Sequence, residues 1–389
     1  MKNKNITFMV LAFILVAIHW QYNFVEIYKK IESYYVDYHL KRITSPDSSG
    51  WINGKKGIVV LGDSISHGAF VSNIQEHGWV RMLSRHWQSK SGTSSYGFVP
   101  MMTVAPGTSL ESRDVNSINF TNVGSGWKAL SHANAMDFPN GFAMRSSNPG
   151  NKISVSIPNF QDGFIVHHAN QLGGGKFNVY SGGERVASVD TGTNNNKLAH
   201  TRVTFNKNPS PHRDISLQII DANPVDILGF SYVSDKVEPI VQNMSQSGRR
   251  LRYISAKLID NVFHDSAVVI VALGQNDFQE SGEEYKKETR AVIDGMIESA
   301  KKYNTDIIVP DFCWTATKSN WLRVELARLA SETGGVYIPY PDIIAEKNNN
   351  TPTDVDVLVS KMKMWVDGSH PNKLGNEFIY EQFIKFTGW

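Results

Sequence analysis

The chain has 389 residues, of which 41% are hydrophobic and 20% charged, a composition typical of a globular protein with a sizeable core. This length is expected to hold two domains rather than one. The formal net charge of +2 gives no support for a nucleic-acid or polyanionic partner. Cys313 is the single cysteine, which excludes an intrachain disulfide and a zinc site built on several thiolates.

The first segment of the chain predicts export. A short basic stretch precedes a nearly wholly apolar run from Ile6 to Ile18, as in an export signal. The run is shorter than a comfortable membrane span of about 20 residues, and no small-x-small cleavage site follows it. We therefore favour an uncleaved signal anchor at residues 1–22 over a cleaved signal peptide or a buried core helix, with a stalk and linker at residues 23–50. An exported chain is periplasmic or at the cell surface, and this anchor would tether it to the inner membrane as its only membrane contact.

A buried strand and a sharp turn come next. Residues 57–61 contain four consecutive branched apolar residues and predict a buried strand. Gly-Asp-Ser interrupts this pattern, so Ser64 lies at the carboxyl end of a strand, where open α/β sheets place their ligands. Residues 74–88 have helical spacing. We expect Trp79 on this helix to pack in the core, and a role as a substrate platform is the less favoured alternative.

Residues 96–236 predict an inserted β-sandwich. Gly, Ser, Asn and Thr are dense there, and turn signals separate short β-rich runs. The α/β pattern resumes afterwards, so we interpret residues 51–95 and 237–389 as one α/β domain that carries the insertion. His167 and His168 are adjacent on an expected strand and point to opposite faces, which favours two structural histidines over a metal site. The expected strands include 152–157, 164–168, 177–180, 185–189, 201–205, 215–220 and 227–233.

Strands and helices alternate in the last third of the chain. This alternation implies a parallel sheet with right-handed crossovers. Strands are expected at 239–242, 267–273, 306–309 and 336–338, and helices at 283–303, 320–332 and 372–387, with a polar loop at 347–353.

Two polar motifs directly follow strands of this series. Gly274-Gln275-Asn276-Asp277 follows the 267–273 strand, and an asparagine there can direct an amide N–H at a developing oxyanion. The stretch from Asn243 to Gly248 follows the strand near residue 240, where glycine lets a backbone N–H approach closely as a second donor. Ordinary polar loops are the alternative interpretation of both motifs.

A third motif, Asp367-Gly368-Ser369-His370, immediately precedes the last helix. An Asp and a His three residues apart can lie side by side, so that the carboxylate holds the imidazole tautomer while the other ring nitrogen faces a serine hydroxyl. Free serine is a poor nucleophile and needs such a base. The alternative is a helix N-cap beside a satisfied surface histidine. His67, three residues past Ser64, is a less favoured candidate base.

Gly-Asp-Ser, Asn-x-Ser-x-x-Gly, Gly-x-Asn-Asp and Asp-x-x-His, in this order, resemble the four blocks of the SGNH (GDSL-type) hydrolase superfamily. The likeness covers about residues 57–90 and 237–389 and implies a flavodoxin-like three-layer α/β fold. It implies Ser64 as the nucleophile, His370 as its base and Asp367 as the partner of the base. It also implies an oxyanion hole formed by Ser64, Gly248 and Asn276, with no metal or organic cofactor.

The insertion narrows the resemblance further. An exported SGNH hydrolase with an inserted all-β sandwich, jelly-roll and similar to carbohydrate-binding modules, resembles bacterial O-acetylesterases of cell-wall or surface glycans, peptidoglycan O-acetylesterases above all. We therefore expect a serine esterase that removes O-acetyl groups from an acetylated glycan outside the cytoplasm, with no nucleic-acid partner. The alternatives are an O-acetyltransferase with the same triad, a lipase-like esterase, and a glycan-binding protein whose α/β domain is inert.

Overall fold

The computed structural model describes residues 51–52, 55–71, 73–92, 94–101, 119–131, 137–138, 141–158, 162–194, 197–205, 212–234, 240–315, 320–349 and 355–389. The expected signal anchor at 1–22 and the stalk and linker at 23–50 lie outside the described residues. Within these described ranges, no helix combines the length and the apolar character needed to cross a membrane.

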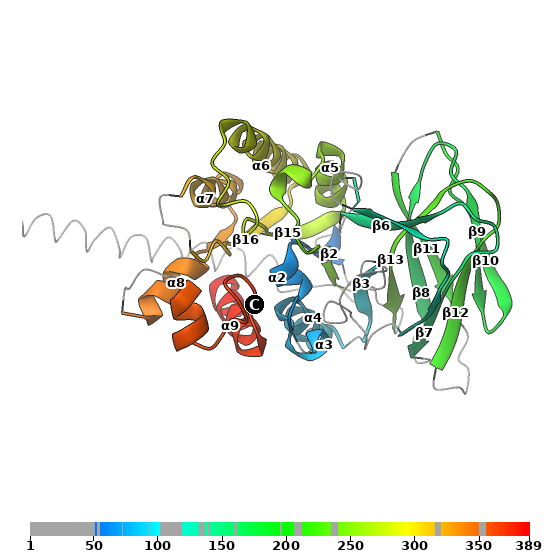
Figure 1. The fold of residues 1–389 in the computed structure, drawn as a ribbon, viewed down its shortest axis with the longest axis horizontal. Coiled ribbons are helices and arrows are strands. Elements are labelled where there is room, and N and C mark those ends of the chain that lie inside the picture. The colour runs from blue at the N-terminus through cyan, green and yellow to red at the C-terminus, as the bar shows by residue number, and fades with distance from the viewer. Residues whose placement is uncertain are drawn as a thin grey trace, which may run out of the picture. The chain divides into compact units, whose positions relative to one another are not determined.

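A six-stranded sheet forms the centre of the α/β part (Figure 1). Its parallel strands stand in the order β14-β2-β15-β16-β17. The first of these parallel strands along the chain, β2, therefore lies second, and the order reverses between β2 and β15. This is the flavodoxin-like order, as expected. A short strand, β1, is antiparallel to β2 and was not predicted. The strands are β1 Trp51–Ile52, β2 Lys55–Gly62, β14 Val241–Asn243, β15 Ser266–Ala272, β16 Asp306–Pro310 and β17 Val336–Ile338.

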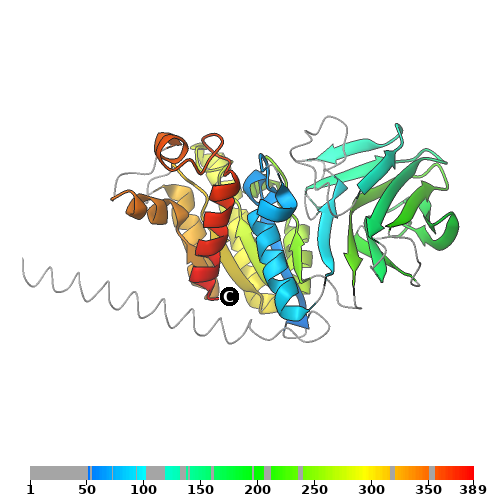
Figure 2. The same ribbon diagram turned by 90° about the horizontal axis from the view of Figure 1, so that it is seen from below.

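Helices cover both faces of this sheet, with α5, α6 and α7 on one face and α4 and α9 on the other (Figure 1, Figure 2). The helix expected over residues 74–88 is two helices, α3 and α4, because Gly78 between them has extended backbone angles (φ −68°, ψ 130°). The helices are α2 Ser64–His67, α3 Ile74–His77, α4 Trp79–Ser91, α5 Ala256–Asp265, α6 Glu283–Tyr303, α7 Trp321–Thr333, α8 Tyr340–Lys347 and α9 Lys373–Thr387, with the 3₁₀ helix η4 Leu251–Tyr253 and the π-helix η5 Val357–Lys361.

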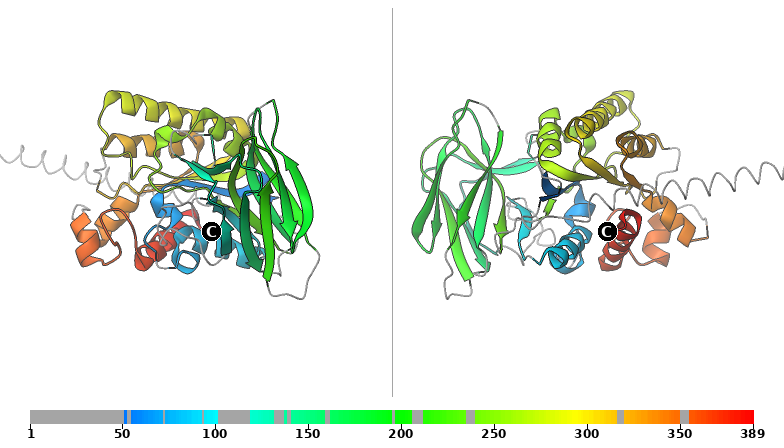
Figure 3. Two further views of the ribbon diagram at one scale, coloured as in Figure 1. Left: turned by 45° about the vertical axis from the view of Figure 1, so that its right-hand side comes forward. Right: turned by 180° about the vertical axis from the view of Figure 1, so that it is seen from behind.

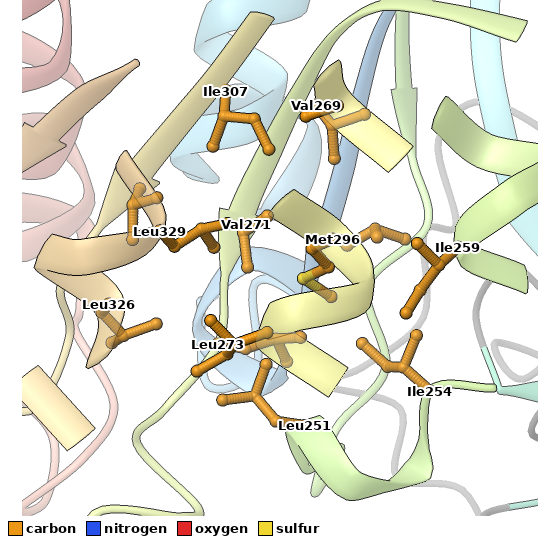
Figure 4. Packing of buried hydrophobic residues seen from close by; sticks show 14 of the residues in the cluster. Leu251, Ile254, Ile259, Val269, Val271, Leu273, Met296, Ile307, Leu326 and Leu329 are labelled. Atoms are coloured by element: carbon orange, nitrogen blue, oxygen red, sulfur yellow. The ribbon is translucent and has the colours of Figure 1, made fainter. Parts of the chain in front are cut away.

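An apolar layer joins the sheet to α5, α6 and α7 (Figure 4). Val269, Val271 and Leu273 alternate along β15 and its end, so all three point to the same face. Met296 from α6 meets them there, and each such buried side chain contributes about 1.5–3 kcal/mol relative to an exposed one. On α4, Trp79 is fully buried and packs with aromatic rings of the interior, as expected for a core residue.

The insertion is a β-sandwich of two antiparallel sheets (Figure 3). One sheet has the order β10-β9-β12-β7-β4 and the other β11-β8-β13-β6-β5, with β3 paired to β13, and buried apolar side chains of both sheets form one core. The runs named individually as expected strands did not include β3 to β6. The strands are β3 Tyr96–Pro100, β4 Asn119–Val123, β5 Lys128–Ser131, β6 Phe142–Ser146, β7 Lys152–Pro158, β8 Gly163–Asn170, β9 Lys176–Ser181, β10 Glu184–Asp190, β11 Lys197–Thr204, β12 His212–Ile219 and β13 Val225–Val233. The domain boundaries at residues 96 and 236 stay a prediction.

His167 and His168 on β8 each have a separate hydroxyl partner. His167 Nε2 lies 2.7 Å from Ser231 Oγ, and His168 Nε2 lies 3.0 Å from Thr201 Oγ1. These contacts agree with two structural histidines. Across the part of the chain that the structure describes, no three His, Cys, Asp or Glu side chains gather as a metal site would require.

Candidate active site

Ser64 begins the one-turn helix α2 directly beyond the end of β2. Asp63 caps this turn, because its side-chain Oδ1 accepts a hydrogen bond from the Ile65 N–H at 3.0 Å. The turn ends at Gly68, whose left-handed φ of 88° suits glycine. Ser64 is thereby held at the carboxyl edge of the sheet, beside the point where the strand order reverses and where such sheets bind ligands.

The structure brings Ser64, His370 and Asp367 together. His370 Nε2 lies 2.9 Å from Ser64 Oγ, although the two residues are 306 positions apart in the chain. The other ring nitrogen, Nδ1, lies 2.8 Å from the nearer carboxylate oxygen of Asp367. A hydroxyl, an imidazole and a carboxylate in this sequence of contacts are the arrangement that activates a serine as a nucleophile.

Asp367 fixes both the turn and the histidine tautomer. Its Oδ1 accepts hydrogen bonds from the backbone N–H groups of Ser369 and His370, each at 2.7 Å. Burial raises the pKa of Asp367, but the hydrogen bonds from the His370 ring and these two N–H groups outweigh it, so the pKa lies below its usual value. The carboxylate is therefore ionised near neutral pH and favours a proton on Nδ1 of His370, which leaves Nε2 to accept the Ser64 proton.

Two side chains from other parts of the α/β domain hold the loop that carries His370. Trp314 Nε1 donates a hydrogen bond to the Ser369 carbonyl at 3.2 Å. Gln275 Nε2 donates to the Ser369 hydroxyl at 3.1 Å. Gln275 lies within the Gly-x-Asn-Asp block, so the loop that follows β15 positions the loop that carries the histidine. Sequence reasoning did not assign this role to Gln275.

Gly248 and Asn276 lie in the loops that follow β14 and β15, the strands on either side of β2. Because parallel strands end at the same edge of a sheet, these loops and the Ser64 turn leave the sheet at the same edge. Gly248 has a left-handed φ of 74°, which glycine adopts readily. Asn276 Nδ2 donates to the Arg249 carbonyl at 3.1 Å, which orients the amide and leaves its second N–H as a donor.

The loop after β14 is also tied to the nucleophile turn. Asn243 Nδ2 donates to the Ser66 carbonyl at 2.9 Å, and the Gln246 N–H donates to the Gly62 carbonyl at 3.0 Å. His67, the less favoured candidate base, directs Nδ1 to the Ser247 hydroxyl at 3.3 Å. The ring in contact with the Ser64 hydroxyl is that of His370.

Two buried carboxylates beside the site were not singled out by the sequence reasoning. Burial, with a smaller contribution from Asp277, raises the pKa of Asp63 to about 7. Burial also raises the pKa of Asp277 to about 6, against hydrogen bonds from the Tyr285 hydroxyl and the Leu251 N–H. Their places within Gly-Asp-Ser and Gly-x-Asn-Asp were the available signal, because both adjoin a candidate catalytic residue.

Comparisons with known proteins place these observations in a family context. Residues 58–383 match the profile of the GDSL-like lipase/acylhydrolase family. A solved structure described as a peptidoglycan O-acetylesterase in action superposes with a TM-score of 0.61 at 15% identity, over 89% of this chain and 94% of that one. A family two carbohydrate esterase from Clostridium thermocellum, in complex with cellohexaose, has a TM-score of 0.26 at 12% identity, over 69% of this chain and 97% of that one. No curated protein matches the sequence.

Proposed function

The chain belongs to the family of GDSL-like lipases and acylhydrolases, which are carboxylic ester hydrolases, and from this premise we propose that it removes O-acetyl groups from an extracytoplasmic glycan. The observation that carries the proposal is the contact between His370 Nε2 and Ser64 Oγ at 2.9 Å, with Asp367 behind the ring. It supplies a serine nucleophile with a general base at hydrogen-bond distance.

The proposed reaction begins at the Ser64 hydroxyl. Its proton passes to His370 Nε2 as Oγ forms a bond to the acyl carbon, and the carbonyl oxygen becomes an oxyanion. Collapse of this intermediate breaks the bond to the alcohol oxygen, and His370 returns the proton to that oxygen. Water then attacks the acyl-enzyme, gives its proton to His370, and releases acetate as Ser64 recovers its hydrogen.

The proposed oxyanion hole combines three donors: the backbone N–H groups of Ser64 and Gly248 and the side-chain amide of Asn276. The support for it is the shared sheet edge of the three loops and the fixed orientation of the Asn276 amide. Loss of one such donor typically lowers the rate by about 100- to 1000-fold.

The proposed substrate rests on the inserted β-sandwich, and the proposed location rests on the N-terminal segment. The inserted β-sandwich beside an esterase domain is the arrangement expected of an enzyme that acts on glycans, and the peptidoglycan O-acetylesterase shares this chain's fold. The basic and apolar N-terminal segment supports export, with residues 1–22 as a tether to the inner membrane. Peptidoglycan or a surface polysaccharide is therefore the proposed substrate.

Acetate release from O-acetylated peptidoglycan, acetylated xylan and other acetylated polysaccharides tests this proposal. We expect release from peptidoglycan to be preferred, and Ser64→Ala to abolish it. Equal activity in the Ser64→Ala protein would refute the mechanism, and preference for long-chain nitrophenyl esters would refute the acetyl assignment. Transfer of acetyl to an added oligosaccharide, detected by mass spectrometry, would identify a transferase instead. A fluorophosphonate that fails to label Ser64 would indicate an inert, glycan-binding domain.

A further inference from the structure

Phe70 is an exposed aromatic residue beside the candidate base. The residue is 46% exposed, and its ring centroid lies 4.6 Å from that of His370, with the two planes inclined at 44°. Of the phenylalanine and tryptophan side chains that the structure describes, it alone is exposed. Single exposed apolar side chains are common on protein surfaces, so the informative feature of this ring is its position beside the candidate base.

The backbone of Phe70 adopts a strained conformation. Its φ of 65° is in the left-handed region, which a bulky L-residue rarely adopts. Both neighbours are fixed, because Ala69 donates its N–H to the Ser64 carbonyl at 2.9 Å and Val71 is buried. A strained residue held by its surroundings at a reactive centre indicates a functional role.

The proposed chemistry determines which part of the substrate meets this ring. His370 must return a proton to the departing alcohol oxygen, so that oxygen has to lie within hydrogen-bond reach of Nε2. Phe70 packs against the same imidazole. From this contact we infer that the ring faces the alcohol side of the ester rather than the acyl side. The open part of its ring presents an apolar face with negative π density, which suits the C–H hydrogens of a pyranose ring.

We propose that Phe70 is the platform on which the sugar that carries the ester stacks during deacetylation. This inference rests on the proposed esterase function, and it assigns the specificity for a sugar alcohol to one side chain next to the base. The acetyl group itself is held at Ser64 and does not contact the Phe70 ring.

The test compares two esters with the same acyl group in the full-length protein. Phe70→Gly removes the ring and suits the left-handed backbone, whereas Phe70→Trp keeps an aromatic face. We expect Phe70→Gly to lower kcat/KM for an O-acetylated amino-sugar disaccharide about 3- to 10-fold more than for ethyl acetate. This factor corresponds to losing the apolar contact that the bound sugar would make with roughly half a phenylalanine side chain. The loss is expected in KM, and Phe70→Trp should restore most of it. Val324→Ala, which alters a 53% exposed residue on α7, is the control and should change neither substrate.

Three results would overturn the inference. The first is no loss of kcat/KM on either substrate in Phe70→Gly. The second is an equal loss on both, which would make Phe70 only a support for His370. The third is a loss in Phe70→Trp as large as in Phe70→Gly. A binding measurement separates this inference from the proposed function. In the Ser64→Ala background, saturation-transfer NMR with the disaccharide should show the same 3- to 10-fold weakening, estimated as above, when Phe70 is replaced by Gly. Failure of Ser64-dependent hydrolysis would refute the esterase proposal, whereas binding that is unaffected by loss of the ring would refute the platform.

Discussion

Replacement of Asp367 by asparagine changes one atom of the proposed triad while preserving its turn. The Asn side-chain oxygen can still accept from the backbone N–H groups of Ser369 and His370, which now donate to Asp367 at 2.7 Å each. The new NH₂ group would stand where a carboxylate oxygen lies 2.8 Å from His370 Nδ1. An NH₂ group cannot accept a hydrogen bond, so the imidazole proton moves to Nε2. That nitrogen can then no longer take the Ser64 proton.

The size of the effect follows from the tautomer and from the exposure of the carboxylate. A misplaced imidazole proton in a serine–histidine–aspartate site lowers kcat by roughly 10⁴-fold. Asp367 is 46% exposed, so water screens part of its charge toward the imidazolium. We therefore expect a loss of roughly 10²- to 10⁴-fold, equal to about 3–5 kcal/mol of activation free energy.

The assay is steady-state hydrolysis of p-nitrophenyl acetate, with a thermal melt of each variant. Asp265→Asn is the matched control, because Asp265 also faces a histidine, at 2.8 Å from His264 Nδ1, but on an exposed part of α5. We expect it to leave kcat and the melting temperature unchanged. A folded Asp367→Asn protein that keeps more than about a tenth of the wild-type kcat would refute the role given to Asp367.

Three other predictions concern the donors, the core and the buried acid. Asn276→Ala should lower kcat for p-nitrophenyl acetate about 100- to 1000-fold, with little change in KM. Leu273→Ala, at a fully buried position, should lower the free energy of unfolding in urea by about 2–5 kcal/mol. Burial raises the pKa of Asp63 from 3.8 to about 7, so the folded state binds this proton more tightly than the unfolded state and stability falls as pH rises across that interval. The measurement is the free energy of unfolding in urea at about pH 5 and at about pH 8. Asp63→Asn should reduce the difference between these two values, whereas the exposed-site change Asp214→Asn should not.

Long elements with clear ends were predictable from the sequence. The helix expected over 283–303 matches α6, because its apolar residues repeat at helical spacing across many turns. The helix expected from residue 320 corresponds to α7, where Asn320 caps the start and Gly334 ends it with a left-handed backbone. These local signals agree with the tertiary packing, so no neighbouring element overrides them.

Elements that depend on their partners were not predictable. Strand β5 has no buried residue and, among the described strands, pairs only with β6, so its strand geometry comes from tertiary pairing rather than from its own residues. Helix α5 is a different case, because its sequence did carry a signal that the prediction missed. Ser255 caps it by accepting from the Leu258 N–H at 3.1 Å, and its buried residues Leu258, Ile259, Val262 and Phe263 recur at helical spacing.

The proposed triad could be named from motif order, because each motif lies just past a strand or before a helix. The residues around the triad could not be named from the sequence. The exposed ring of Phe70 depends on a left-handed backbone angle that no residue type in that stretch predicts. The hydrogen bond from Gln275 to Ser369 joins residues that are 94 positions apart and depends on how two loops meet.

The distance along the chain between Ser64 and His370 has a consequence for biosynthesis. The hydroxyl emerges from the ribosome 306 positions before the imidazole that must activate it, and the whole sandwich is made in between. A nascent or truncated polypeptide that ends before the Asp367 turn therefore carries an inert serine. With the proposed pair of Ser64 and His370, acyl cleavage begins only once the Asp367 turn has been synthesised and lies beside the Ser64 turn.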